Sequence, residues 1–377
     1  MTKKICIIGF GGMGKRHAKD LEEFSGGELE IAGVLEPSDE SYNHGCEWMG
    51  KSPERFFSIS EMLEKVQPDG AVISSPNSNH LDCLLKFKGK KIPLIIEKPL
   101  DTTFDKVLQI VDFCKEYEAP IMVHHVMRYS PIVVKAKEII DSGQIGKIAG
   151  FEMVQFTHGA MFHNFRRTFK NGGGQLLEKG THDFDVLLFL TDTMPSRVAS
   201  MCKRQVYGGN MPNDLVCSKC DKTSECRHFE ETPNTSHDST NSKELCVYAD
   251  EIDIFDYESC LIELENGISG TYSECFFSKA PFSRRYEFSG TEGFLAINFS
   301  KREILLSNHN GDDTFSFDYE GHIHYNGAPG VAEHFLQLIK GETSKVISPV
   351  DEAFAAEQIS FAAYRSNETG NFVNINP

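Results

Sequence analysis

Short apolar runs and amphipathic stretches alternate along roughly the first 120 residues of the chain. The apolar runs are rich in Ile, Val and Leu and predict strands buried on both faces, whereas the stretches between them place apolar residues at helical spacing. Regular alternation of strand and helix predicts an α/β domain with a doubly wound parallel sheet. The predicted strands span 5–8, 29–35, 70–75, 93–97 and 121–123. The predicted helices span 59–66, 81–88 and 105–117.

The pattern changes from about residue 147, where longer runs alternate between apolar and polar residues. Such runs predict a large, mostly antiparallel and open sheet, and few helical stretches accompany them, so the second domain is of the α+β class. The dipeptide Asn266-Gly267 between two of these runs is typical of a β-hairpin. The predicted strands span 148–156, 259–264, 268–276, 286–289 and 302–306.

These patterns divide the chain into two predicted domains, at 1–124 and 125–377. Within the second, a stretch at about 207–250 is rich in Ser, Thr, Asn and Asp and is expected to be an insertion or long loop. An amphipathic stretch at about 350–364 predicts a last helix that packs back on the body of the protein.

Three glycines, Gly9-x-Gly11-x-x-Gly14, follow the first apolar run and precede an amphipathic stretch. The first glycine permits a tight strand-to-helix turn, the second lets the backbone approach a pyrophosphate, and the third lets the helix pack closely on the strand. The N-terminus of that helix offers free N–H groups to phosphates. A glycine-rich surface turn is the alternative. We predict that 1–124 is a Rossmann domain and that the turn, with Gly12 and Met13, binds a dinucleotide.

Glu36 ends the second predicted strand, 22 residues beyond Gly14. An acidic side chain at this place accepts hydrogen bonds from ribose hydroxyls and repels a 2′-phosphate, so NAD is favoured over NADP. Lys15 and Arg16 are a signal in the opposite direction, because cations nearby can accommodate that phosphate. The alternative for Glu36 is a solvated strand end.

Composition excludes several classes of protein. The 377 residues are enough for two domains, and 38 basic against 55 acidic residues give a net charge of −17 without a long block of Lys or Arg, so we expect no nucleic-acid partner. No stretch approaches the ~20 apolar residues of a membrane span. The first strand begins too early to leave room for a signal peptide, and with eleven cysteines this predicts a reducing, cytoplasmic location.

Two polar clusters follow predicted strands of the first domain. They are Ser75-Pro76-Asn77-x-x-His80 and Glu97-Lys98-Pro99. The carboxyl ends of parallel strands form the edge at which an open α/β sheet binds its ligand. A lone lysine is usually a solvated surface residue, but at this edge Lys98 is a candidate for function.

A third cluster lies in the second domain, after Gly172-Gly173-Gly174. Glu178, His182 and Asp185 recur at i, i+4 and i+7, which is one face of a helix. A histidine beside carboxylates can accept a hydroxyl proton near neutral pH. The alternative is a structural, hydrogen-bonded histidine on a helix face.

Together these motifs resemble the Gfo/Idh/MocA family, named for glucose–fructose oxidoreductase, inositol dehydrogenase and a rhizopine-catabolism protein. They match in order over about residues 5 to 190, with Arg128-x-x-Pro131 among them, and Gly290-Thr291-Glu292-Gly293 extends the similarity. The resemblance implies a nicotinamide dinucleotide in the first domain, a sugar, inositol or related polyol over the second sheet, and a homo-oligomer, a dimer or tetramer. The implied cofactor contacts, beyond the glycine turn and Glu36, are Ser75, Pro76, Asn77, His80, Glu97, Lys98 and Arg128.

The resemblance also assigns roles in a reaction. Lys98 lies between cofactor and substrate, where it orients the reacting hydroxyl and lowers its pKa, and His182 is the general base. Family members often carry Asp where Glu178 stands, so Glu178 either contacts substrate or tunes His182. The implied substrate contacts are Lys98, Glu178, His182 and Asp185, and Arg166 joins them on a polar loop at 157–168 that also holds His158, His163 and Asn164; His322 to Tyr325 are a further candidate loop.

The polar insertion contains Cys217-x-x-Cys220-x5-Cys226-x-His228. Two cysteines two residues apart can present thiolates to one tetrahedral ion, and Cys226 with His228 or Cys246 could complete four ligands. A structural zinc site is therefore one interpretation. Free or redox-active thiols are the other, since no second C-x-x-C is present.

Three functions remain at this point. The leading hypothesis is an NAD-dependent dehydrogenase that oxidises a secondary hydroxyl of a sugar or cyclitol. The second is a glycosidase or lyase that oxidises its sugar transiently and returns the hydride, as some proteins of the family do. The third is a catalytically silent NAD-binding regulator, which retention of Lys98 and His182 argues against.

Overall fold

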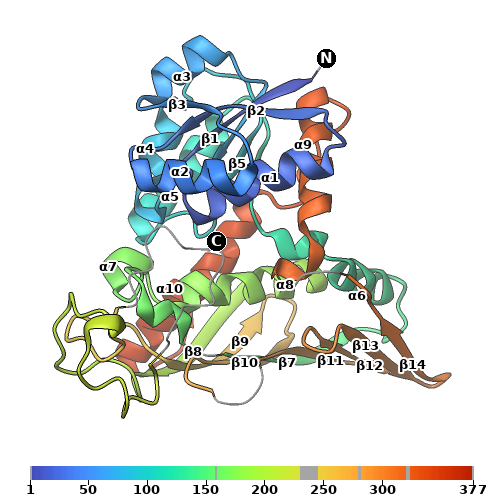
Figure 1. Cartoon of the computed structure of the whole chain (residues 1–377). Coiled ribbons are helices and arrows are strands. Elements are labelled where there is room, and N and C mark those ends of the chain that lie inside the picture. Colours follow the sequence, from blue (N-terminus) through green and yellow to red (C-terminus); the bar gives the residue numbers. More distant parts are fainter. Residues whose placement is uncertain (1, 158, 230–244, 279–281, 320–322, 376–377) are drawn as a thin grey trace.

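The computed structural model contains two sheets with a layer of helices between them (Figure 1). It describes residues 2–157, 159–229, 245–278, 282–319 and 323–375. No described helix is both long enough and apolar enough to cross a membrane.

The N-terminal sheet is parallel and has the strand order β3-β2-β1-β4-β5-β6. The chain runs outward from β1 to one edge and then returns to build the other side from β4 onward. The order therefore reverses next to β1, which is where an open α/β sheet binds its ligand. The strands are β1 (Lys3–Ile8), β2 (Leu29–Leu35), β3 (Glu54–Phe56), β4 (Gly70–Ile73), β5 (Leu94–Ile96) and β6 (Ile121–Val123).

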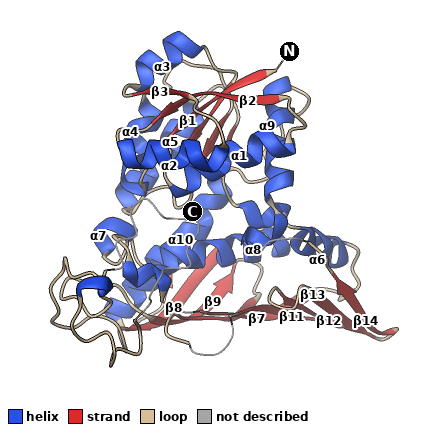
Figure 2. Cartoon of the chain, in the orientation of Figure 1, coloured by secondary structure: helices blue, strands red, loops and turns tan. Residues whose placement is uncertain are grey.

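Helices cover both faces of this sheet (Figure 2). The strands bury alternate side chains on opposite faces: Cys6 and Ile8 pack with one set of helices, and Ile5 and Ile7 with the other. The first set is α3 (Ile59–Val66), α4 (His80–Leu85) and α5 (Phe104–Glu116), and the second is α1 (Gly12–Phe24), α2 (Asp39–Met49) and α9 (Ala328–Lys340).

Helix α9 belongs to the C-terminal part of the sequence but packs on the N-terminal sheet. Its buried residues Val331 and Phe335 share a core with Ile5, Ile7 and Ile95. The N-terminal core is therefore completed by a segment from beyond residue 125, a feature that the division into 1–124 and 125–377 does not contain.

The second sheet has nine strands in the order β14-β13-β12-β11-β7-β10-β9-β8-β15. All neighbouring pairs are antiparallel except β7 and β10, which are parallel. The strands are β7 (Ile148–Phe156), β8 (Pro195–Lys203), β9 (Tyr257–Leu264), β10 (Ser269–Cys275), β11 (Ser283–Gly290), β12 (Gly293–Asn298), β13 (Glu303–Asn308), β14 (Gly311–Ser316) and β15 (Val373–Asn374).

Helices cover the face of this sheet that is turned toward the N-terminal domain (Figures 1 and 2). Apolar residues of these helices and of the inner sheet face form the largest core of the protein. The helices are α6 (Pro131–Asp141), α8 (Thr181–Thr191) and α10 (Val350–Thr369), with the short α7 (Phe169–Gly172) and a π-helical turn at Leu176–Gly180 before α8.

The predicted fold class is confirmed, and several predicted elements agree closely with the structure. Strands at 29–35, 121–123 and 148–156 and the helix at 59–66 have the predicted bounds, and Asn266-Gly267 joins β9 to β10. The last helix is longer than predicted and contacts both α8 and β8. The helices and strands that were not predicted are β3, β8, β12, β14, β15, α2, α6, α7 and α9.

Candidate functional site

The glycine turn between β1 and α1 has the geometry that a bound dinucleotide requires. Gly9 has a φ of +87°, which side chains rarely adopt. A Cβ atom at Gly14 would lie 1.8 Å from the Gly9 carbonyl oxygen, whereas one at Gly11 would meet nothing within 4 Å. The helix is thus packed tightly on the turn, and the turn is open at Gly11, where the backbone can approach a phosphate.

Glu36 lies beside this turn at the end of β2. One carboxylate oxygen accepts the Phe10 N–H at 2.9 Å and the other accepts the Ser38 N–H at 2.9 Å. Lys15 is only 1% exposed, with its ammonium 2.8 Å from His44 Nδ1 and over the Trp48 ring. One of the two cations expected to accommodate a 2′-phosphate is therefore buried against side chains of α2.

His80 is the first residue of α4 (His80–Leu85), which follows β4. It is fully buried, and its ring nitrogens lie 3.0 Å from the carbonyl oxygens of Leu100 and Ser75. The imidazole joins the loops after β4 and β5 to each other. Its ring is enclosed by these loops in the structure, and the predicted contact of His80 with a cofactor stays a prediction.

Lys98 extends from the end of β5 toward the C-terminal domain. Its ammonium donates to the Glu178 backbone carbonyl at 2.6 Å. The Glu178 carboxylate accepts from Asn77 Nδ2 at 3.2 Å and from an Arg166 guanidinium nitrogen at 2.8 Å. Residues of the predicted cofactor and substrate groups therefore meet at the π-helical turn between the two domains.

Neighbouring side chains stabilise the negative charge of the Glu178 carboxylate. Burial alone would raise the pKa of this carboxyl, but the charges of Lys98, Arg166 and Lys179 and the hydrogen bond from Asn77 outweigh it and lower the pKa below its usual value. Both carboxylate oxygens are occupied by protein donors. This arrangement fits a carboxylate that joins the domains better than one that binds a substrate hydroxyl.

His182 lies in the first turn of α8 and is 6% exposed. The ring of His125 lies edge-on to it, with centroids 6.4 Å apart. Burial lowers the pKa of His125 to about 4, so this neighbour is uncharged near neutral pH. Because residues 176–180 form a π-helical turn, the predicted single α-helical face through Glu178, His182 and Asp185 is not continuous.

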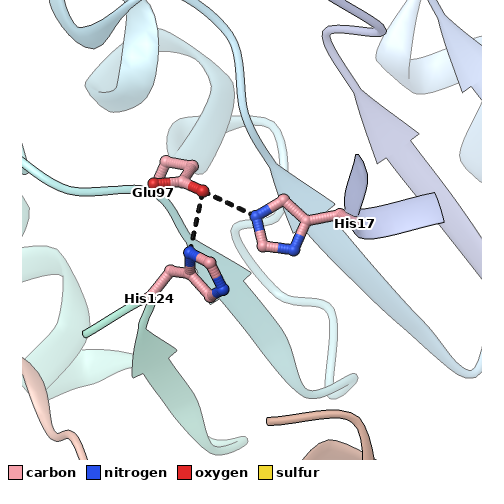
Figure 3. Close-up of side chains that lie close together, drawn as sticks. All are labelled: His17, Glu97 and His124. Atoms are coloured by element: carbon pink, nitrogen blue, oxygen red, sulfur yellow. Dashed lines mark hydrogen bonds and ion pairs between the residues drawn. The ribbon is translucent and has the colours of Figure 1, made fainter. Parts of the chain in front are cut away.

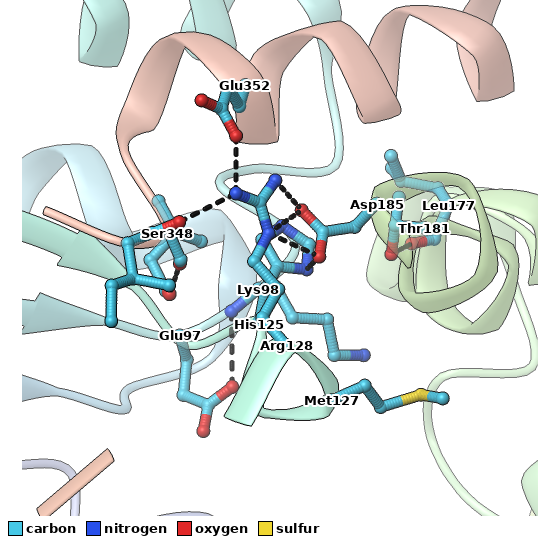
Figure 4. Close-up of polar contacts among 12 residues, drawn as sticks. Glu97, Lys98, His125, Met127, Arg128, Leu177, Thr181, Asp185, Ser348 and Glu352 are labelled. Carbon is cyan, nitrogen blue, oxygen red and sulfur yellow. Dashed lines mark hydrogen bonds and ion pairs between the residues drawn. The ribbon is translucent and has the colours of Figure 1, made fainter. Parts of the chain in front are cut away.

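Arg128 and Asp185 form a buried ion pair next to His125, whose Nδ1 atom lies 3.7 Å from an Asp185 carboxylate oxygen (Figure 4). The Arg128 Nε and Nη2 atoms donate to the Asp185 carboxylate at 2.6–3.1 Å, and Nη1 donates to the Ile347 carbonyl at 2.7 Å and to Glu352. Arg128 is 2% exposed and Asp185 is fully buried. In the structure these two side chains bind each other, and the contacts of Arg128 with a cofactor and of Asp185 with a substrate stay predictions.

Sequence analysis missed the cluster around Asp183, the residue after His182. Its carboxylate accepts from the Tyr272 hydroxyl at 2.9 Å, from Arg284 at 2.8 and 3.0 Å, and from the Tyr286 hydroxyl. These donors come from β10 and β11, so Asp183 attaches the first turn of α8 to the sheet beneath it. The one sequence signal is that Arg284 and Tyr286 stand two apart, on one face of a strand.

A metal site needs several His, Cys, Asp or Glu side chains whose ligand atoms lie close together. Among the described residues, one group of three has its ligand atoms within 4.8 Å of one another, and it consists of His17, Glu97 and His124. The thiols of the insertion form no such group, and the ring of His228 lies near those of Tyr207 and Tyr248. Neither His158 nor His322 of the polar loops lies in the described part of the chain.

The fold and the glycine turn define a class of protein, the dinucleotide-binding oxidoreductases with a Rossmann domain. Residues 3–125 match the family model described as an NAD-binding Rossmann fold of the oxidoreductase family, and residues 133–296 match that of the GFO/IDH/MocA C-terminal domain. The chain belongs to the Gfo/Idh/MocA family. The predicted resemblance is thereby confirmed, as is the prediction of an NAD-binding oxidoreductase.

Individual relatives are distant. The rhizopine catabolism protein MocA of Rhizobium meliloti is 24% identical over 230 residues, which are 59% of this chain and 70% of MocA. Inositol 2-dehydrogenase of the same species is 26% identical over 203 residues, 53% of this chain and 58% of that enzyme. This chain thus aligns with little more than half of the length of the inositol dehydrogenase.

A solved structure covers the whole fold. Levoglucosan dehydrogenase in complex with NADH and levoglucosan superposes with a TM-score of 0.81 at 16% identity, with both chains covered completely. At this identity the similarity concerns the fold.

Proposed function

We propose that this protein is an NAD-dependent dehydrogenase that transfers a hydride from a secondary hydroxyl of a sugar, cyclitol or related polyol to the nicotinamide. Bound NAD⁺ supplies the hydride acceptor. The glycine turn and Glu36 would hold the dinucleotide at the carboxyl edge of the parallel sheet, and the open space at Gly11 fits a pyrophosphate.

Lys98 and His182 would carry the chemistry. The Lys98 ammonium donates to the hydroxyl oxygen that reacts, which orients the substrate and stabilises the negative charge that develops there. His182 accepts the hydroxyl proton as the C–H hydride leaves, so proton and hydride depart to different acceptors. Glu178 acts indirectly, by holding Asn77 and Arg166 against each other across the domains.

One observation carries this proposal. The Lys98 ammonium, from the cofactor-binding edge, lies 2.6 Å from the Glu178 carbonyl, in the turn that leads directly into the helix of His182. The Lys98 amine of the first domain and the His182 imidazole of the second thus both lie near the boundary between the two domains. Two known relatives named for inositol and levoglucosan dehydrogenation support a polyol as substrate.

A substrate screen tests the proposal. Purified protein with NAD⁺ is offered inositols, aldoses, levoglucosan and nitrophenyl glycosides, and NADH formation, aglycone release and product identity are followed together. Net NADH formation that Lys98→Ala abolishes is the expected result. Aglycone release without net NADH would replace the dehydrogenase with a transient-redox glycosidase. If Lys98→Ala and His182→Ala left every turnover unchanged while NAD still bound, catalysis at this site would be refuted.

We further propose that NAD is preferred to NADP. Support comes from Glu36 at the end of β2 and from the burial of Lys15. A thermal-shift titration with both dinucleotides should give the larger shift with NAD. A larger shift with NADP would reverse this assignment.

A structural zinc ion in the insertion is a separate proposal. Support comes from the bridge between Val216 and Leu245, which brings the flanks of Cys217 and Cys246 together. Burial raises the pKa of Cys246, and the neighbouring thiols of Cys220 and Cys226 raise it further. Cys246 and His228 are both candidates for the fourth ligand. Elemental analysis should find about one zinc per chain that Cys220→Ser removes, and metal-free folded protein would refute the site.

We also propose a cytoplasmic homo-oligomer. All eleven cysteines are described and none is in a disulfide, as expected of a reducing compartment. The outer face of the nine-stranded sheet exposes Met201, Leu261 and Leu305 and offers a surface for a second copy. Light scattering after size exclusion should show a dimer or tetramer, and Leu261→Asp should shift it toward the monomer.

A further inference from the structure

The carboxylate of Glu97 lies between two imidazoles (Figure 3). One oxygen, Oε1, is 2.7 Å from His17 Nε2 and 2.9 Å from His124 Nδ1. The three residues come from α1 and from the ends of β5 and β6, and each is at most 6% exposed. Three separate elements thus converge on one buried carboxylate at the edge where the cofactor is expected.

The hydrogen bonds fix which nitrogens carry protons. A carboxylate oxygen only accepts, so His17 donates from Nε2 and His124 donates from Nδ1. Burial would raise the pKa of Glu97, but the charge of His124 and the hydrogen bonds from His124 and His17 outweigh it and hold the pKa well below its usual value. Burial lowers the pKa of His17, and the charge of His124 lowers it further. The cluster therefore holds an ionised carboxylate with a neutral His17.

The same three residues have the donor types of a zinc site, but their spacing fits hydrogen bonds. Two ligands of a tetrahedral zinc ion at bond lengths of ~2.1 Å are separated by about 3.4 Å. The two nitrogen–oxygen distances here are shorter, 2.7 and 2.9 Å. Both contacts are ordinary charge-assisted hydrogen bonds, so the cluster is complete without a metal.

The other oxygen of the carboxylate connects the cluster to Lys98. Oε2 accepts the backbone N–H of Lys98 at 3.1 Å, while the Lys98 ammonium reaches the Glu178 carbonyl in the opposite domain. The two imidazoles thus orient Glu97, and Glu97 orients the peptide from which Lys98 projects. Neither imidazole is needed to hold the dinucleotide in the proposed mechanism.

We propose that His17 and His124 are positioning residues that act through Glu97 to fix Lys98 in its catalytic place. This inference rests on the proposed function, because it needs Lys98 to be the residue that orients the hydroxyl. Removing one N–H donor leaves a buried carboxylate with too few hydrogen bonds. Glu97 then takes up a proton or turns away, and the Lys98 peptide loosens.

Amide replacements separate this role from simple packing. A glutamine at position 17 can present its side-chain N–H near the place of Nε2, and an asparagine at position 124 near that of Nδ1. His17→Leu and His124→Leu remove the donors, whereas His17→Gln and His124→Asn keep them. His334→Leu is the matched control, because His334 is also buried and hydrogen-bonded, to Tyr129 and to the Lys345 carbonyl, but lies on α9.

The first readout needs no substrate. Hydrogen exchange of peptides spanning 97–100 is measured with saturating NAD⁺, and the Leu variants should exchange at least about tenfold faster there, while the amide variants and His334→Leu stay within about threefold of the parent. Equal protection in all five variants would overturn the inference, and so would equal loss in the amide and Leu variants. This readout stands even if Lys98→Ala shows that Lys98 is not catalytic, which refutes the proposed function instead.

The second readout uses whichever polyol of the screen is turned over. The Leu variants should lose kcat by roughly 10- to 100-fold with little change in KM. Their acid limb in the pH profile should move to higher pH, because the pKa of Glu97 is no longer held down by its donors. Other titratable or charged groups facing the cluster are His80 from α4, Asp20 on α1, His125 after β6 and Lys98 itself. An unmoved acid limb in folded Leu variants would contradict the positioning role.

Discussion

Glu36 in the cofactor half of this protein is held by other means than Asp183 and Asp185 in the substrate half. In the cofactor half, Glu36 accepts two backbone N–H groups, from Phe10 and Ser38. In the substrate half, Asp183 and Asp185 are paired with arginines 101 and 57 residues away in the sequence. The first arrangement needs only a turn of the right shape, whereas the second needs specific side chains from distant segments. Substitutions should therefore affect the two halves differently.

The largest effect is expected at His182, whose imidazole is the proposed base. His182→Ala should lower kcat by roughly 10²- to 10⁴-fold, because the hydroxyl proton loses its acceptor. The dissociation constant of NAD should stay nearly unchanged, since the residue belongs to the other half. Stopped-flow turnover and NADH fluorescence titration measure the two quantities. A parallel loss of NAD binding would show that the halves are not separable in this way.

Asp183 tests the stability of the substrate half. Asp183→Asn removes the charge that compensates the buried Arg284 and should lower the free energy of unfolding by about 3–5 kcal/mol. Urea unfolding followed by circular dichroism measures this loss. The control is Asp312→Asn, because Asp312 is an exposed residue of β14. A loss below about 1 kcal/mol would mean that the cluster is not critical for folding.

Glu357 is buried in a third way, because its carboxyl group is protonated and therefore neutral. Burial raises its pKa to about 8, and its Oε1 atom accepts the Leu100 N–H at 2.6 Å. The folded state keeps this proton to about pH 8, while the unfolded state loses it near its ordinary pKa. The stabilisation is thus complete at acid pH and is lost as the pH rises toward 8. Glu357→Gln should flatten that decline, by about 2–3 kcal/mol between about pH 6 and pH 8. Identical slopes in urea titrations of both proteins would contradict it.

The smaller effect at Glu36 concerns affinity. Glu36→Ala should weaken NAD binding about tenfold, or about 1.4 kcal/mol, and improve the ratio of NADP to NAD affinity. The change in unfolding free energy should be well below that of Asp183→Asn. Isothermal titration with each dinucleotide gives the ratio. An unchanged ratio would remove Glu36 from the recognition of the ribose.

The smallest effect is expected at an exposed ion pair of the substrate half. Arg197 and Glu263 form an ion pair at 2.6 Å on the outer sheet surface, with side chains 45% and 36% exposed. Water screens this pair, so Arg197→Ala should change the free energy of unfolding by less than about 1 kcal/mol. A loss as large as that of Asp183→Asn would mean that this face is covered, as in an oligomer, and light scattering would then identify the assembly.

These differences also explain which features could be predicted from the sequence. The glycine turn and Glu97-Lys98-Pro99 are local, because their function follows from a strand end and a few adjacent residues. The partners of Asp183 could not be predicted, since they depend on the register of β10 and β11 beneath α8. The π-helical turn could not be predicted, because it changes which side chains share a helix face without changing the amino-acid composition of the segment.

The same reasoning applies to Arg128 and Asp185. The motifs in which they stand are close to functional residues in the sequence, so a contact with ligand was expected. In the structure the two side chains bind each other, and Arg128 also binds Glu352, 224 residues away in the sequence. Spacing along the chain indicates which segments lie at the site but leaves open which side chains face it.

Helix α9 has a consequence for synthesis and engineering of the molecule. The strands of the cofactor sheet leave the ribosome first, but the face formed by Ile5, Ile7 and Ile95 gains its cover of Val331 and Phe335 only when most of the chain has followed. Until then the nascent N-terminal half presents an uncovered apolar face, as would any fragment cut near residue 125. A chimera that exchanges cofactor specificity between relatives must therefore transplant 328–340 together with the first 125 residues. These two segments form one folded unit although they are far apart in the sequence.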